Sequence, residues 1–239
     1  MVEVEENRRI HREAIFACIA NGSRLLEETY DLEFRGPPAT RLFLAMIAQE
    51  EFAKAFMLFL VRRGLIPFSP AVHRAIQDHI CKQLMGMIMD YMIMDWETIE
   101  EARAMIARDA ELGDLLPDDV GSALEILDYE KIGRWTRNNW VWAENPNYNS
   151  AAVKIAKGRQ DRLKQDALYV RIGSDGRLVS TPDKVGEEDV ERELERAKSY
   201  DRFVRSAVGM IEDRLFAEWR YDKIMNALII VFSRPKQEA

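Results

Sequence analysis

Residues 41–62 read RLFLAMIAQEEFAKAFMLFLVR, and this stretch decides the fold class. It contains neither glycine nor proline, the two residues that most often interrupt a helix. Apolar side chains occur almost all the way round the helix that it would form, whereas a surface helix carries them on one stripe. We therefore expect a helix buried at the centre of a helical bundle.

The segments on either side also show a helical pattern of apolar residues. RGPP at 35–38 ends a first helix, and GLIPFSP at 64–70 ends the central one. Ser69 followed by Pro70 is typical of the start of a third helix. This third helix is expected to run to about residue 108, with or without a break, and the last helix to be continuous or in two parts. The expected helices span about 4–34, 38–63, 70–108, 118–138, 150–165 and 187–232.

One segment departs from the helical pattern. Residues 167–182, ALYVRIGSDGRLVSTP, alternate with a period of two around Ser-Asp-Gly, which is typical of a hairpin. The sequence therefore predicts a mainly all-α fold, a single helical domain over residues 1–239, with one small β-hairpin inserted near residues 167–182. The core bundle is expected over about 4–138 and 186–232, and a loop, a basic helix and the hairpin over about 139–185.

The composition is that of a globular, mildly acidic protein. Apolar residues make up 47% and charged residues 31%, and the net charge is −7. Such a charge does not favour general attraction to nucleic acid or to an anionic membrane, so any RNA contact would need a local basic patch. Cys18 and Cys81 belong to no CxxC pair, which argues against a disulfide framework and a zinc ribbon. With no signal peptide and no apolar run long enough for a bilayer, we expect a cytoplasmic protein without a membrane segment.

Three charged residues, Glu50, Glu51 and Lys54, stand out within the apolar central helix. Their spacings of three and four residues place them close together on a helix surface. Buried charges need partners, because an unpaired charge inside a protein is strongly unfavourable. Two interpretations are open: an internal ion pair that fixes the helix register, or the polar wall of an active site between helices.

A second polar cluster is HRAIQDHICK at residues 73–82, which contains two of the three histidines of the chain. On one continuous helix, Arg74 and His79 would lie roughly 140° apart and could flank one cleft. Histidine transfers protons near neutral pH, and arginine binds phosphate and its developing charge. Arg74 and His79, with Lys82 one turn later, therefore suit RNA cleavage. The alternative, which the composition alone favours, is an ordinary solvated helix face.

Two further segments could contact RNA. GRWTRNNWVW at 133–142 combines arginines with tryptophans, which can stack on unpaired bases, although tryptophans that hold a loop onto a bundle are more common. A basic run after it is either a phosphate-contacting surface or a solvated face. It consists of Lys154, Lys157, Arg159, Arg162 and Lys164. Motifs for di-iron, zinc-protease, P-loop and dinucleotide sites are absent from the sequence, so we expect no metal and no cofactor.

Three motifs occur in an order that resembles a known family. QEEFAKAF at 49–56 lies on the apolar helix, DHICKQ at 78–83 follows it, and ALYVRIGSDGRLVSTP precedes a long final helix. Together they resemble the AbiV-type abortive-infection proteins of bacteria, a branch of the HEPN superfamily. The resemblance covers about residues 10–220.

This resemblance implies an α-helical bundle that commonly dimerises. Many HEPN proteins are metal-independent endoribonucleases in which an Arg-x4–6-His motif cleaves RNA from a cleft at the dimer interface, and RAIQDH would supply Arg74 and His79. Proteins that resemble AbiV act in phage defence by blocking phage multiplication and shutting down translation, and a phage protein can be the trigger. One departure is Ala75, where catalytic HEPN proteins often carry a polar residue.

The leading hypothesis is therefore a cytoplasmic antiviral-defence protein that acts as a homodimeric HEPN-type ribonuclease. His79 would act as general acid and base, Arg74 would bind the phosphate, and Lys82 would assist. The supporting residues would be Glu50, Glu51, Lys54 and Asp78. No metal would be required, because the ribose of RNA supplies its own nucleophile.

Two other hypotheses remain open from the sequence. One is a non-catalytic helical dimer that acts by binding a phage protein or a translation component. It predicts no RNA cleavage and a loss of protection when surface contacts, rather than His79, are changed. The other is the passive half of a toxin–antitoxin pair.

Overall fold

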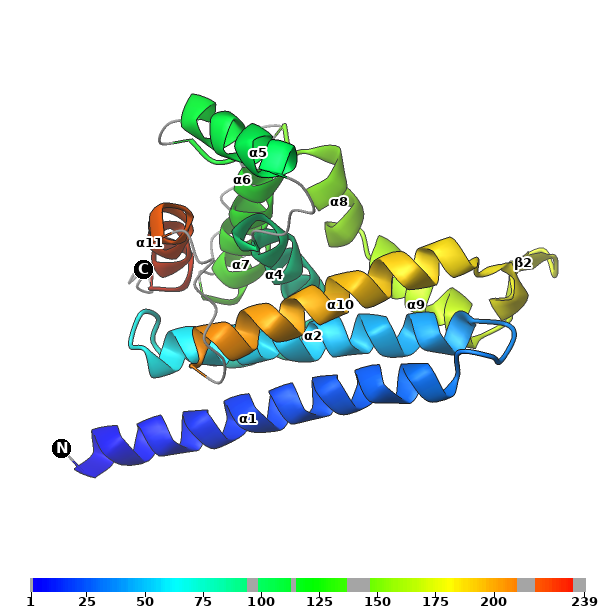
Figure 1. Cartoon of the computed structure of the whole chain (residues 1–239), viewed down its shortest axis with the longest axis horizontal. Helices are drawn as coiled ribbons and strands as arrows, with labels where there is room; N and C mark the ends of the chain where they lie inside the picture. Colours follow the sequence, from blue (N-terminus) through cyan, green and yellow to red (C-terminus); the bar gives the residue numbers. More distant parts are fainter. Residues whose placement is uncertain (1, 94–98, 113–114, 137–146, 210–217, 234–239) are drawn as a thin grey trace. The chain divides into compact units, whose positions relative to one another are not determined.

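The computed structural model describes residues 2–93, 99–112, 115–136, 147–209 and 218–233. The chain forms two compact units. Unit 1 comprises residues 1–62 and 157–211, and unit 2 comprises residues 63–156 and 212–239. Both are built from helices, and the only strands in the described ranges form one two-stranded sheet (Figure 1). The predicted fold class, mainly α with one small hairpin, is confirmed.

The elements of unit 1 come from both ends of its sequence. Its helices are α1 (Val2–Asp31), α2 (Ala39–Arg62), α9 (Arg159–Leu168) and α10 (Glu187–Ala207), with a short 3-10 turn, η2 (Pro182–Lys184). Its strands are β1 (Arg171–Ile172) and β2 (Leu178–Ser180).

Helix α2 is the centre of unit 1, as its apolar sequence predicts. It lies between α1 and α10, and α9 contacts it as well (Figure 1). Phe52 and Phe56 are fully buried, and the Phe56 ring lies 5.2 Å from that of Phe203 on α10. A Cβ on Gly22 of α1 would lie 2.6 Å from the Phe52 ring, so α1 and α2 approach closely only because this residue is glycine.

The hairpin contacts α9 through two of its polar side chains, Arg171 and Ser180. Arg171 pairs with Ser180 across the two strands, and Ile172 pairs with Leu178. Asp166 on α9 accepts a hydrogen bond from the Ser180 hydroxyl at 2.6 Å and forms an ion pair with Arg171 at 2.6 Å. The predicted hairpin at 167–182 is confirmed, and several of its large apolar side chains are exposed.

Unit 2 contains the helices between α2 and α9 and the last helix of the chain. They are α3 (Pro70–Ala75), α4 (His79–Met92), α5 (Ile99–Leu112), α6 (Asp118–Glu125), η1 (Ile126–Ile132), α7 (Gly133–Thr136), α8 (Ser150–Ala156) and α11 (Glu218–Ser233). The η1 segment is a π-helix. Helix α4 contacts α6, α8, η1 and α11, and its Met85 and Met89 are fully buried. These methionines fill the core of unit 2, where flexible side chains pack well.

Three of the expected helices are interrupted. The helix expected over 70–108 is divided into α3, α4 and α5, because the backbone is extended at Asp78 (φ −75°, ψ 122°) before α4 and at Ile93 (φ −72°, ψ 119°) after it. The basic helix expected over 150–165 is two helices, separated at Gly158, which has a positive φ of 74°. The last helix ends at Ala207, just before Gly209 at φ 77°, and resumes at Glu218. In each case a residue outside helical backbone geometry ends the helix.

The tryptophan- and asparagine-rich loop expected at 138–150 lies largely outside the described residues. Within those residues, no helix has both the length and the apolar composition needed to cross a bilayer.

Candidate functional site

Arg74 and His79 lie at the two ends of a tight turn in unit 2. Arg74 belongs to the last turn of α3, and its carbonyl accepts hydrogen bonds from the N–H groups of Gln77 at 3.1 Å and Asp78 at 3.0 Å. His79 is the first residue of α4, and its side chain is exposed. The two residues therefore belong to successive helices. The expectation that they lie 140° apart on one helix is wrong, because the extended backbone of Asp78 redirects the chain between them.

Asp78 is the N-cap of α4. Its Oδ1 accepts a hydrogen bond from the Cys81 N–H at 2.9 Å. Such a cap stabilises a helix by about 1 kcal/mol, because it satisfies a backbone donor that has no partner within the helix. The Oδ2 of Asp78 lies 3.5 Å from the Lys131 Nζ of η1. This cap was not predicted from the sequence, although an Asp directly before an apolar helical run is a signal for one.

The guanidinium group of Arg74 lies over the ring of Trp135 on α7. Its Cζ is 4.5 Å from the ring centroid, which is within the range of a cation–π interaction. Among the residues that the structure describes, no acceptor is hydrogen-bonded to this guanidinium and no carboxylate forms an ion pair with it. Its N–H donors are therefore available for an anionic ligand. In the predicted aromatic segment at 133–142, Trp135 contacts Arg74, and residues 137–142 lie outside the described part of the chain.

The pKa of the Cys81 thiol reflects the charges around the α3–α4 turn. Its side chain is fully buried, and burial raises the pKa of the thiol well above its ordinary value. The nearby carboxylate of Asp78 raises this pKa further, while Lys131 and Arg74 lower it. Three charged groups therefore act on the same buried sulfur atom. Because a thiol with a raised pKa stays protonated, Cys81 is unsuited to act as a nucleophile.

The other polar residues of this stretch differ in exposure. Lys82 is buried, with 6% of its surface exposed, and its backbone N–H donates to the Asp78 carbonyl at 3.1 Å. His73 is exposed, and its Nε2 lies 3.1 Å from the Gln77 side-chain nitrogen. The assisting role of Lys82 stays a prediction.

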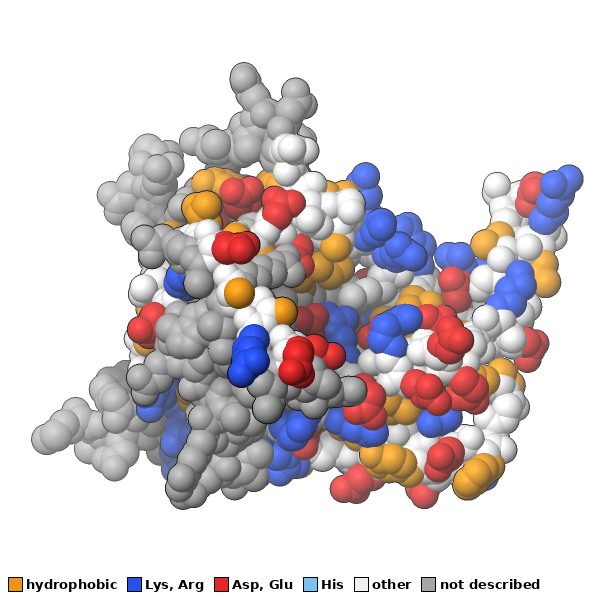
Figure 2. All heavy atoms as spheres, turned by 45° about the horizontal axis from the view of Figure 1, so that its top comes forward, with side chains coloured by type: hydrophobic (Ala, Val, Ile, Leu, Met, Phe, Trp, Pro, Cys, Tyr) orange, Lys and Arg blue, Asp and Glu red, His pale blue; other side chains and the backbone are white. Residues whose placement is uncertain are grey.

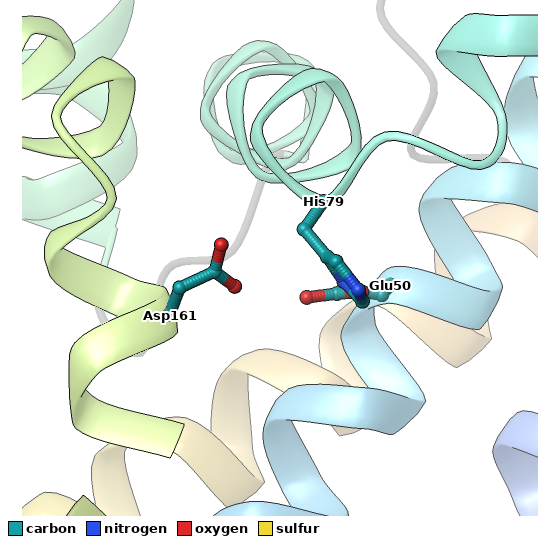
Figure 3. Close-up of side chains that lie close together, drawn as sticks. All are labelled: Glu50, His79 and Asp161. Atoms are coloured by element: carbon teal, nitrogen blue, oxygen red, sulfur yellow. The ribbon is translucent and has the colours of Figure 1, made fainter. Parts of the chain in front are cut away.

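The three charged residues singled out on α2, Glu50, Glu51 and Lys54, belong to unit 1 and take part in two separate ion pairs. Lys54 Nζ lies 2.6 Å from Glu51 Oε1. Glu50, which is 4% exposed, pairs with the buried Lys164 of α9, and Lys164 Nζ is also 2.8 Å from Asp161 Oδ1. Figure 3 shows the carboxylates of Glu50 and Asp161 directed towards each other from α2 and α9, and it labels His79 at the start of α4.

Lys164 and Asp161 are partners that the sequence analysis did not identify. Lys164 was expected in a basic run, either on a phosphate-contacting surface or on a solvated face, but it is 5% exposed. The other four basic residues of that run are exposed. A signal for burial was available, because Lys164 lies three residues before the buried Ala167 on one face of α9.

The candidate residues are thus distributed over both units. The predicted catalytic residues Arg74, His79 and Lys82 belong to unit 2, together with Asp78. The remaining supporting residues, on α2, belong to unit 1. Their role in orienting the catalytic residues stays a prediction, and the contacts of Glu50 and Glu51 agree with the interpretation as internal ion pairs.

Comparisons with known proteins identify the family. No curated protein matches the chain, and no solved structure matches it. The family model of AbiV, a HEPN-type family, matches residues 11–201. The match includes the α3–α4 turn with Arg74 and His79, the charged residues of α2 and the hairpin. Because the match covers most of the 239 residues, the chain belongs to the AbiV family of HEPN proteins.

Proposed function

We propose that this AbiV-family protein is a metal-independent endoribonuclease that cleaves RNA and shuts down translation on phage infection. Family membership supports a function of the abortive-infection type. One observation carries the ribonuclease assignment. The exposed His79 and Arg74, whose N–H donors are available, lie at the two ends of one turn. An acid–base group and a phosphate-binding cation are the two side chains that RNA cleavage needs.

The proposed reaction uses the ribose as nucleophile. Arg74 binds the scissile phosphate and stabilises the charge that develops on it. His79 accepts the proton of the 2′-hydroxyl, whose oxygen attacks the phosphorus, and the bond to the 5′-oxygen breaks. The leaving 5′-oxygen receives the proton that His79 has accepted, so His79 is regenerated and the products are a 2′,3′-cyclic phosphate and a 5′-hydroxyl. Lys82 follows His79 by three residues on α4 and adds positive electrostatic potential to the site.

We further propose that the protein acts in the cytoplasm as a homodimer with a cleft between two copies, as the HEPN relationship implies. A phage-encoded protein would activate it or be its target. If the phage protein is the activator, the ribonuclease would be inactive until infection, which would explain how a toxic activity is tolerated by the host.

The test is a comparison of His79→Ala and Arg74→Ala with His73→Ala, a matched control on the neighbouring histidine. Removing a general acid–base group or a phosphate-binding arginine should lower RNA cleavage by roughly 100-fold or more, whereas His73→Ala should cleave like the wild type. Cleavage is measured on total RNA and on a defined oligoribonucleotide, with the end groups identified by mass spectrometry. Phage protection is measured in parallel. Unchanged cleavage and unchanged protection in His79→Ala would show the mechanism to be wrong.

One observation favours the second candidate function, a non-catalytic protein that acts by binding. The hairpin exposes a group of large apolar side chains, which Figure 2 shows at its surface on the right of the view. They are Tyr169, Val170, Ile172, Leu178 and Val179. Exposed apolar groups of this kind often mark sites of protein binding. This candidate predicts that polar substitutions in the hairpin abolish protection while His79→Ala retains it.

A further inference from the structure

A rare π-helical turn connects α6 and α7 in unit 2. The Gly133 N–H donates to the Asp128 carbonyl, five residues earlier. Such turns are uncommon in proteins and are frequent at functional sites. A Cβ on Gly133 would lie 2.5 Å from that carbonyl oxygen, so no other residue fits without a shift of the backbone. The wide turn therefore depends on glycine.

This turn presents two side chains to the helices that carry Arg74 and His79. Lys131 of η1 pairs with Asp78, the cap of α4. Trp135, four residues later, lies beneath Arg74 of α3. Residues four apart lie on the same side of a helix. One face of η1 and α7 therefore contacts both ends of the α3–α4 turn.

The way in which Trp135 holds Arg74 matters for phosphate binding. A carboxylate partner would hold the guanidinium through its N–H donors and would occupy them. An indole ring attracts the guanidinium through its flat face and leaves the donors around the edge available. These donors are the groups that bind two phosphate oxygens at once. The contact thus restricts the orientation of Arg74 without competing with a substrate.

We infer that Trp135 and Lys131 are positioning residues for the ribonuclease site. Trp135 orients the Arg74 guanidinium, and Lys131 fixes the cap of α4, the helix from which His79 projects. The inference rests on the proposed function, because it gives the two residues a role in the same reaction. Neither residue touches the substrate. Their effect passes through Arg74 and Asp78.

The main test uses Trp135→Leu, with Phe16→Leu as the matched control. Phe16 lies 5.2 Å beneath Arg12 on α1, so its replacement removes the same kind of contact from unit 1. Trp135→Leu should lower kcat for RNA cleavage roughly tenfold and change KM less than about twofold, because a misplaced Arg74 loses more stabilisation of the transition state than of the bound substrate. Phe16→Leu should leave both values unchanged. An unchanged kcat in Trp135→Leu would overturn the role of Trp135.

Conservative variants distinguish positioning from a structural role. Trp135→Tyr and Trp135→Phe keep a ring that fills the site, but they attract a cation less strongly than tryptophan does. The kcat should fall in the order Trp, Tyr, Phe while the melting temperatures stay similar, and this series remains informative should the leucine variant not fold. A kcat that follows the melting temperature alone would overturn the inference.

A double variant tests whether Trp135 acts through Arg74. If it does, Arg74→Ala combined with Trp135→Leu should be no slower than Arg74→Ala alone, whereas independent effects would add. Failure of the proposed function is distinct: Arg74→Ala and His79→Ala would then cleave at the wild-type rate. If Arg74→Ala and His79→Ala cleave slowly but Trp135→Leu cleaves at the wild-type rate, the inference about Trp135 is wrong and the proposed function stands.

The role of Lys131 has its own test. Lys131→Met should lower kcat roughly threefold, because the cap of α4 loses its charged partner. The control is Lys198→Met, which removes the exposed pair with Glu195 on α10 and should leave kcat unchanged. A lower melting temperature with an unchanged kcat in Lys131→Met would overturn the role of Lys131.

Discussion

A deeply buried ion pair joins two helices of unit 1. Glu50 and Lys164 are 4% and 5% exposed, and they are 114 positions apart in the sequence. Taking two charges out of water is unfavourable, and their attraction offsets this cost only while both partners are present. Asp161 adds a second, half-buried partner for Lys164. The pair therefore matters for how α9 is held against α2.

Replacing Glu50 tests this pair. Glu50→Gln should lower the free energy of unfolding by about 3 kcal/mol, because it removes the buried carboxylate that pairs with Lys164. Glu51→Gln is the matched control, since its pair with Lys54 is closer to the surface and should contribute about 1 kcal/mol or less. Urea denaturation measures both. Equal losses in the two variants would contradict the argument.

Tyr148 gives a prediction about pH. Burial, followed by the nearby carboxylates of Glu130 and Glu125 and by Tyr129, raises its pKa to about 12, while an unfolded tyrosine has a pKa of about 10. The folded state therefore holds the phenolic proton more strongly than the unfolded state does. Its contribution to stability is fully present below about pH 10 and is lost as the pH rises towards 12. In a spectrophotometric titration, Tyr148→Phe should remove a phenolate step near pH 12. Titration of every tyrosine close to pH 10 would contradict this expectation.

Among the elements of unit 2, η1 positions the residues that contact the α3–α4 turn. Its backbone needs glycine at position 133, because the Asp128 carbonyl occupies the space of a Cβ. The same turn sets the positions of Lys131 and Trp135. A change in one glycine should therefore affect stability and cleavage together.

The test compares two glycine-to-alanine changes, one directly after η1 and one in α6, the helix before it. Gly133→Ala should lower the free energy of unfolding by roughly 1–3 kcal/mol, because the new methyl group crowds the Asp128 carbonyl. At Gly121 of α6 a Cβ meets nothing within 4 Å, so Gly121→Ala should raise stability by about 0.5–1 kcal/mol. Chemical denaturation measures both. Similar stability changes in the two variants would contradict the proposed crowding.

Some elements of this fold can be predicted from local sequence patterns, and others depend on contacts between distant segments. The central position of α2 and the hairpin follow from local patterns, apolar residues all round a helix and alternation around a turn. The break at Asp78 had a local signal, but its strength depends on Lys131, 53 positions later. The burial of Lys164 depends on Glu50 from a distant segment. The stacking of Arg74 on Trp135 and the π-turn beneath it arise from packing, for which the sequence has no simple period.

At the scale of the whole molecule, the family relationship makes a prediction about assembly. We expect a homodimer, because HEPN-type ribonucleases place their Arg and His residues at an interface between two copies. Light scattering during size-exclusion chromatography should give twice the chain mass of 27.7 kDa. A mass of 27.7 kDa at the concentrations used for cleavage assays would contradict a dimeric site.

The position of α2 between α1 and α10 has a consequence for how the protein is made. Helix α1 is synthesised before α2 and can cover it at once, but α10 ends at Ala207. At 5–20 residues per second, the ribosome needs roughly seven to thirty seconds to pass from the end of α2 to the end of α10. During this time the apolar side of α2 that receives Phe203 is uncovered on the nascent chain. We therefore expect a chaperone to bind α2 during synthesis, and we expect the yield of this protein to depend on the cell's capacity to protect unfinished chains.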